Sequence, residues 1–155
     1  ARCLVRAKYF DNKIAGAWLR AIGCIPAGDG KRESIATAVE TLDAGRSVAV
    51  MIEGKIVPPD RREADGMGEI RGGFVEIARK ADAPIMPIAV TGSDVIWASR
   101  GRIFRLPWRG RPLVHVRTGP PITVTGKSDD EVLTETRAAL AGLLALDAPT
   151  GGSAA

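Results

Sequence analysis

The sequence predicts an α/β fold in which a mostly parallel sheet is flanked by helices. Two apolar runs, at residues 48–52 and 85–90, have the length of buried strands and are separated by a charged loop and a segment of helical spacing. In that segment Phe74, Ile77 and Ala78 share one helical face, because they lie three and four residues apart. A strand, a helix and a second strand in this order are expected to form a parallel crossover unit.

Shorter segments predict the elements that precede this unit. Residues 3–7 are predicted to form a short strand, and Asp11 is expected to cap the helix that follows it. Residues 23–27 are expected to be extended. A second helix is predicted over residues 31–44, and Gly45 is expected to end it.

The first helix carries an apolar stripe with two interpretations. Ile14, Trp18 and Ile22 follow one another at four-residue spacing and therefore lie on one helical face. Such a stripe usually packs into the core of a globular protein. The alternative is an amphipathic helix that faces a membrane.

The elements after the second apolar run are predicted from apolar spacing and a capping signal. Residues 113–116 are expected to form a strand, and Ser128 is expected to cap a final helix because Glu131 lies at capping-box spacing. The tail at 148–155 is rich in Ala, Pro, Gly and Ser and is predicted to be disordered. One domain is therefore expected over residues 1–147.

The composition is typical of a globular α/β protein. Of the 155 residues, 45% are hydrophobic and 26% are charged, which argues against a disordered chain. No run of 18 apolar residues occurs, so no transmembrane helix is predicted. Cys3 and Cys24 lack metal-binding spacing, so we expect two reduced thiols in a cytoplasmic environment and no metal site.

The amino terminus has neither an initiating Met nor the features of a signal peptide. Arg2, Arg6 and Lys8 interrupt its apolar residues, and the chain opens directly in the first predicted strand. We therefore expect that an amino-terminal part of the domain is absent from this sequence.

A basic and aromatic segment follows the second apolar run. Residues 97–117 contain six arginines and no acidic residue, interleaved with tryptophan, phenylalanine and aliphatic side chains. This mixture suits an anionic membrane surface, because guanidinium binds phosphate while indole sits at headgroup depth. A solvated loop that packs its aromatic residues on the core and a nucleic-acid site are the alternatives. The residues predicted to contact the membrane are Trp97, Arg100, Arg105 and Trp108.

Several motifs along the chain resemble those of one enzyme family. In order they are RCLVRAKYF at 2–10, GCIP at 23–26, MIEGKI at 51–56, IRGG at 70–73, MPIAVTGS at 86–93 and VHVRTGPPI at 114–122. Their order and spacing resemble the glycerolipid acyltransferases, whose best-known members are 1-acyl-sn-glycerol-3-phosphate acyltransferases. The signatures of that family are N-H-x4-D, G-x-I-x-x-x-R, F-P-E-G-T-R and a V-P-V-A-like strand.

The resemblance implies a glycerol-phosphate acyltransferase-like fold and transfer of a fatty acyl group in phospholipid biosynthesis. The implied donor is acyl-CoA or acyl carrier protein, which acts as a co-substrate, and no cofactor is implied. The implied acceptor is the hydroxyl of a lysophospholipid such as 1-acylglycerol 3-phosphate, reached peripherally at the cytoplasmic face of the membrane. A noncatalytic lipid- or anion-binding domain of the same fold is the alternative. A nucleic-acid partner is not expected, because the aromatic residues are few and clustered in one loop.

The third signature directs attention to Glu53. It follows a predicted strand, and ligands of open parallel sheets collect at the carboxyl ends of their strands. The resemblance implies that Glu53 organises the acceptor pocket, while Gly54 lets the backbone approach the ligand closely. A solvated loop position is the alternative for Glu53. The expected substrate-binding residues are Glu53, Gly54, Lys55, Arg71 and Gly73.

The chain departs from the family at its catalytic signature. There, a His acts as general base and an Asp orients it. The only histidine here is His115, which is expected to be structural and is followed five positions later by Pro120 instead of Asp. The catalytic pair is expected upstream of Ala1, so no catalytic residue is assigned in this chain and the chain alone is expected to be inactive.

The arginines that the family associates with the acceptor phosphate are also replaced. Their positions correspond to about Gly28 and to Ile56. Either the phosphate is held differently or the acceptor is another lipid or amphiphile. The neighbouring cations that could hold a phosphate are Lys31, Arg32, Lys55, Arg61, Arg62 and Arg71.

Overall fold

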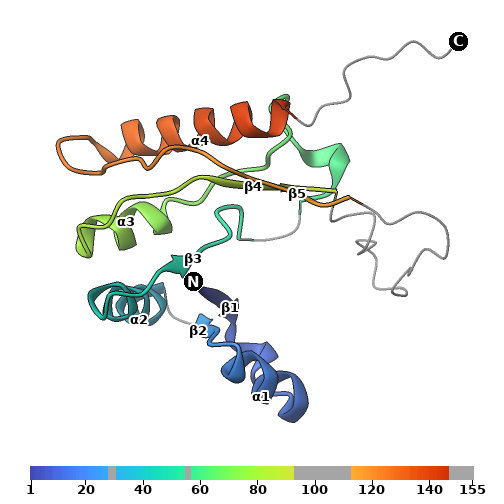
Figure 1. The fold of residues 1–155 in the computed structure, drawn as a ribbon, viewed down its shortest axis with the longest axis vertical. Helices are drawn as coiled ribbons and strands as arrows, with labels where there is room; N and C mark the ends of the chain where they lie inside the picture. Colours follow the sequence, from blue (N-terminus) through green and yellow to red (C-terminus); the bar gives the residue numbers. More distant parts are fainter. Residues whose placement is uncertain (28–30, 55–56, 93–112, 147–155) are drawn as a thin grey trace, which may run out of the picture.

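The computed structural model describes residues 1–27, 31–54, 57–92 and 113–146. Within these residues, a parallel sheet and an antiparallel sheet are packed against α-helices (Figure 1). The predicted α/β class is therefore confirmed. The tail at 148–155 lies outside the described residues.

The parallel sheet has the strand order β2-β1-β3. β1 (Arg2–Arg6) lies at its centre, flanked by β2 (Ile25–Ala27) and β3 (Val48–Ala49). Leu4 pairs with Ile25 on one side and Arg2 pairs with Val48 on the other. Because the strands are parallel, their carboxyl ends lie at one edge, which is where Arg6 and the residues after β3 meet.

The second apolar run enters a different sheet from the one expected. β4 (Ile88–Thr91) pairs antiparallel with β5 (His115–Thr118), and Val90 faces Val116 in the register. The predicted parallel crossover from residues 48–52 to 85–90 is therefore wrong. The hydrophobic pattern identifies extended segments without defining which backbone they bond to, and here that backbone is β5.

The first helix begins one residue later than predicted. After a 3-10 turn (Ala7–Tyr9), α1 runs over Lys13–Ala21, and the Asn12 side chain accepts hydrogen bonds from the backbone of Ile14 and Ala15. Asp11 is thus not the cap, because the carboxamide of its neighbour holds the free amides of the first turn.

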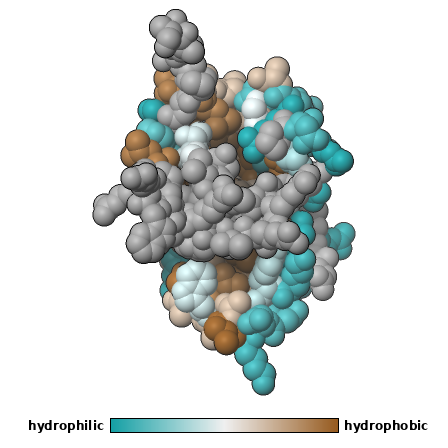
Figure 2. Space-filling model, turned by 90° about the vertical axis from the view of Figure 1, so that its right-hand side faces the viewer, coloured by the Kyte–Doolittle hydropathy of each residue, from teal (hydrophilic) through white to brown (hydrophobic). Residues whose placement is uncertain are grey.

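The apolar stripe of α1 is exposed, so its interpretation as core is wrong. Ile14 is 85% exposed, Trp18 63% and Ile22 51%. α1 lies at one end of the molecule, away from α3 and α4, and apolar surface is visible at that lower end in Figure 2. Of the described helices, none is long and apolar enough to span a membrane.

Two middle helices form the core beside the parallel sheet. α2 (Lys31–Asp43) packs on α3 (Gly73–Lys80), where Ile35, Ala38 and Ile77 are buried together. α2 ends as predicted just before Gly45, and the predicted face of Phe74, Ile77 and Ala78 is buried. A 3-10 turn (Pro59–Arg61) lies in the long segment between β3 and α3.

The last helix joins the antiparallel sheet to α3. α4 (Asp129–Ala145) lies along β4 and beside α3, and its buried Val132 packs with Phe74 and Val75. The predicted capping box is confirmed: the Ser128 hydroxyl accepts a hydrogen bond from Glu131 N, and the Glu131 carboxylate accepts one from Ser128 N at 2.7 Å.

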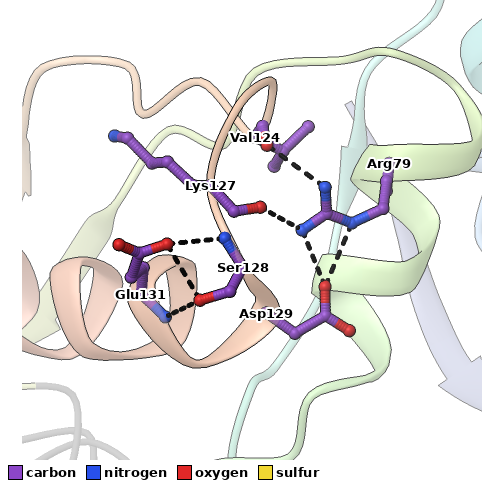
Figure 3. A network of polar contacts seen from close by, with 6 residues as sticks. All are labelled: Arg79, Val124, Lys127, Ser128, Asp129 and Glu131. Carbon is purple, nitrogen blue, oxygen red and sulfur yellow. Dashed lines mark hydrogen bonds and ion pairs between the residues drawn. The ribbon is translucent and has the colours of Figure 1, made fainter.

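Arg79 links α3 to the start of α4. Its guanidinium donates to Asp129 Oδ1 at 2.7 and 3.0 Å and to the carbonyl oxygens of Val124 and Lys127 (Figure 3). This contact ties the last turn of α3 to the first residue of α4.

Gly16 provides a test of how α1 is seated. A Cβ at this position would clash with the Phe10 carbonyl group, whose carbon would lie 2.9 Å away. We expect Gly16→Ala to lower the free energy of unfolding by about 1–3 kcal/mol, because the backbone contact cannot relax cheaply. Chemical denaturation measures this.

Gly142→Ala is the matched control. Gly142 lies within α4 and a Cβ there would meet nothing within 4 Å. Its substitution should stabilise the protein by up to about 1 kcal/mol, as alanine does in an open helix position. A Gly16→Ala variant as stable as the wild type would contradict the close seating of α1.

Candidate functional site

A cleft opens beside the residues that follow β3. It has a volume of about 290 Å³ and is bounded by α2, α3 and the β3 extension, which comprises residues 50–53 directly after β3. Most of its lining is apolar, and Ser34 and Arg71 supply the polar side chains. The lining residues are Ser34, Ile35, Val50, Met51, Ile52, Arg71, Gly73, Phe74 and Ile77.

Arg71 is held at the cleft through its backbone. Its amide donates to Ile52 O at 2.9 Å, which joins the start of α3 to the end of β3. The side chain then lies over Gly54: a Cβ added there would be 3.2 Å from Arg71 Cδ and 3.6 Å from one of its terminal nitrogens. Gly54 has φ +63°, so glycine satisfies both the turn and the close approach.

Arg6 reaches the same turn from the neighbouring strand. Its terminal nitrogen donates to Gly54 O at 3.3 Å. Arg6 was not among the site residues predicted from the sequence. Its position at the carboxyl end of a predicted strand was an available signal, because adjacent parallel strands end at the same edge. Two exposed arginines, Arg6 and Arg71, thus converge on Gly54.

Glu53 is directed toward the backbone of the following segment. Its carboxylate accepts a hydrogen bond from the buried Gly68 N at 2.6 Å, and the residue is half-buried. Glu53 is not among the residues that line the cleft. The structure therefore joins Glu53 to the segment that carries Arg71.

Of His115 and the remaining predicted site residues, one lines the cleft, one lies in the other sheet and five lie outside the described residues. Gly73 begins α3 and lines the cleft, and His115 lies in β5, in the other sheet from β3. The predicted residues outside the described part of the chain are Lys55, Trp97, Arg100, Arg105 and Trp108. Over the described ranges, no cluster of three or more His, Cys, Asp or Glu side chains could hold a metal ion.

A charged cluster lies between α4 and the segment after β3. Arg137 donates to Asp65 Oδ2 at 2.6 Å and to Glu63 Oε2 at 2.8 Å. The hydrogen bond from Arg137 lowers the pKa of Asp65 below its usual range. The same contact, with smaller contributions from the charges of Asp65, Glu63 and Glu53, raises the pKa of Arg137.

Comparison with known proteins decides the family. A family model described as Acyltransferase matches residues 1–91, which is more than half of the 155-residue chain. The chain belongs to this acyltransferase family. The resemblance of its motifs to acyltransferases is thereby confirmed. No curated protein matches the chain.

A solved structure shares the fold. The crystal structure of the 1-acyl-sn-glycerophosphate (LPA) acyltransferase, PlsC, from Thermotoga maritima aligns with 98% of this chain at a TM-score of 0.64 and 18% identity. The present chain spans only 59% of the length of the Thermotoga maritima protein. At this identity the match establishes the fold alone.

The Asp65–Arg137 pair predicts an acid dependence of stability. Because the folded-state pKa of Asp65 is lowered, its contribution is complete above the ordinary carboxyl pKa and is lost as the pH falls through the lowered value. We expect Asp65→Asn to destabilise the protein by about 1 kcal/mol at neutral pH, with allowance for partial exposure, and the difference should narrow on acidification. Denaturation curves recorded across acidic pH measure it.

Asp60→Asn is the control, since Asp60 is an exposed carboxylate in the same segment. Its stability should follow the wild type across the pH range. An Asp65→Asn curve that stays parallel to the wild type at every pH would contradict the role of the pair.

Proposed function

We propose that this chain forms the acceptor-binding α/β unit of a glycerolipid acyltransferase. The reaction transfers a fatty acyl group from acyl-CoA or acyl carrier protein to the hydroxyl of a lysophospholipid such as 1-acylglycerol 3-phosphate. Family membership supports acyl transfer, and the activity named for the Thermotoga maritima protein suggests the acceptor class. The observation that carries the proposal is the convergence of Arg6 and Arg71 on Gly54 beside an apolar cleft.

This arrangement suits a molecule with a phosphate at one end and an apolar chain at the other. Guanidinium groups form paired, charge-assisted hydrogen bonds with phosphate oxygens. The apolar lining, including Val50, Ile52 and Phe74, would receive the glycerol and the beginning of the acyl chain. A cleft of about 290 Å³ would leave the rest of a long chain outside.

The proposed binding residues have different tasks. Arg71 and Lys55 would contact the phosphate, while Gly54 and Gly73 would let the ligand approach the backbone. Glu53 would organise the pocket by holding Gly68 N. In the reaction, the acceptor oxygen attacks the thioester carbonyl while a general base takes its proton; the C–S bond then breaks and the departing thiolate takes up that proton. The family's His-x4-Asp pair would supply that base, and it matches no position of this chain.

We further propose peripheral binding to an anionic membrane at its cytoplasmic face. The exposed stripe of α1 supports this, because its apolar side chains are accompanied by the exposed cations Lys8, Lys13 and Arg20. An amphipathic helix with this combination suits the interface of an anionic bilayer. The segment with Trp97, Arg100, Arg105 and Trp108 would add further contacts.

A noncatalytic anion-binding domain is the second candidate. The divergence of the third signature favours it, because the arginine position of that signature is Ile56. Both candidates predict phosphate binding. Only the acyltransferase predicts turnover when the protein also contains the catalytic pair.

Binding of 1-hexanoylglycerol 3-phosphate tests the acceptor site. Arg6→Gln and Arg71→Gln should each weaken its binding about tenfold or more, because each removes a charged hydrogen-bond donor. Isothermal titration calorimetry on the full chain measures the dissociation constant without requiring turnover.

Arg46→Gln is the matched control, because it removes an exposed arginine that lies before β3, at the opposite end of that strand from Gly54. It should change binding less than twofold. Equal losses in all three variants would indicate a nonspecific charge effect, and unchanged binding in Arg71→Gln would reject the proposed site.

Vesicle flotation tests the membrane surface. Trp18→Asp should reduce binding to phosphatidylglycerol vesicles about tenfold, because it places a charge in the apolar stripe. Binding to phosphatidylcholine vesicles should be weak for every variant. Leu146→Asp is the control, since Leu146 is 65% exposed at the end of α4. Full flotation of Trp18→Asp would reject docking through α1.

A further inference from the structure

We infer that Arg137 of α4 is a positioning residue for Arg71 and thereby for the phosphate of the acceptor. The inference rests on the proposed function, in which Arg71 binds that phosphate. Arg137 does not line the cleft, and it would act through the segment that joins β3 to α3.

Arg137 joins α4 to this segment through two hydrogen bonds. Arg137 Nε donates to Asp65 Oδ2 at 2.6 Å and its terminal nitrogen donates to Glu63 Oε2 at 2.8 Å. The Arg137 side chain is 29% exposed and that of Asp65 is 23% exposed, so solvent screens the pair less than an open surface pair. One guanidinium therefore binds two carboxylates that lie two residues apart.

Hydrogen bonds among residues 63–67 close this part of the segment into a turn. Asp65 Oδ1 accepts a hydrogen bond from Met67 N at 3.1 Å, and Glu63 N donates to Met67 O at 2.7 Å. Gly66 N donates to Glu63 O at 2.9 Å. The carboxylate that binds Arg137 therefore also fixes the turn that leads to Gly68.

Two further hydrogen bonds join the residues after this turn to the β3 extension. Gly68 N donates to Glu53 Oε1, and Arg71 N donates to Ile52 O. These bonds hold the segment at two successive residues of the β3 extension, and Arg71 lies three residues after Gly68. A shift of the turn would therefore displace the Arg71 guanidinium relative to Gly54.

The charge of Glu53, which binds Gly68 N, gives a second link between Arg137 and the segment that carries Arg71. It contributes to the raised pKa of Arg137, so the two groups attract one another. Loss of Arg137 would leave the carboxylates of Glu63 and Asp65 without the cation that binds both of them. Their mutual repulsion would act on the same segment that carries Arg71.

Arg79→Met is the control that distinguishes a positioning effect from a general loss of stability. Arg79 also joins α4 to an earlier part of the chain through an arginine–aspartate contact (Figure 3). Its partners, Asp129, Val124 and Lys127, do not line the cleft. Arg79→Met should thus destabilise the fold without moving Arg71.

The experiment measures 1-hexanoylglycerol 3-phosphate binding and thermal unfolding of the full chain. Arg137→Met should weaken binding about three- to tenfold, since a small displacement of a binding group has effects of this size or larger. Arg137→Lys should restore part of the affinity. In an Arg71→Gln background, Arg137→Met should add less than about a twofold loss, because its effect passes through Arg71.

The outcomes distinguish this inference from the proposed function. If Arg71→Gln weakens binding and Arg137→Met does not, the positioning role is rejected and the proposed site stands. If Arg71→Gln leaves binding unchanged, the proposed site fails and the inference fails with it. If Arg79→Met weakens binding as much as Arg137→Met, the effect is general destabilisation and the inference is overturned. Should Arg137→Met not fold, Glu63→Gln removes one of the two bonds and is measured by the same criteria.

Discussion

The hydrogen bond from Arg71 N to Ile52 O is the constraint on which the cleft depends. It brings the start of α3 back to the end of β3 after a segment that contains little regular structure. β3 itself is only two residues long, so sheet pairing does not fix the residues after it. The wall of the cleft is held instead by this bond and by the Glu53–Gly68 contact.

The parallel sheet places the cations of the site. β1 and β3 are neighbours, so Arg6 and the turn at Gly54 emerge at one edge although 48 residues separate them. The apolar surface beside them comes from α2 and α3, whose packing buries Ile35 and Ile77. Charge and apolar surface therefore meet because a sheet edge lies next to a helix pair, which is a frequent location for ligand sites in α/β proteins.

Local sequence signals predicted local features and could not predict their partners. The Ser128 capping box and the buried face of Phe74 depend on spacing within one element, and both are confirmed. Asn12 and Asp11 are both good caps, so the choice between them depends on backbone geometry. The exposure of Trp18 depends on what lies opposite the helix, which periodicity does not encode. Arg137 was not selected because its partners are more than seventy residues away.

The span of the Arg137–Glu63 contact has a consequence for how the protein folds. Seventy-four residues separate the two side chains, so closing that loop carries an entropic cost that local helices do not carry. The Arg137–Glu63 contact should consequently form late, after the helices, and the segment that carries Arg71 should reach its final position with it. A phosphate ester that binds only the finished cleft would act as a pharmacological chaperone, trapping the completed chain and slowing its exposure to proteases.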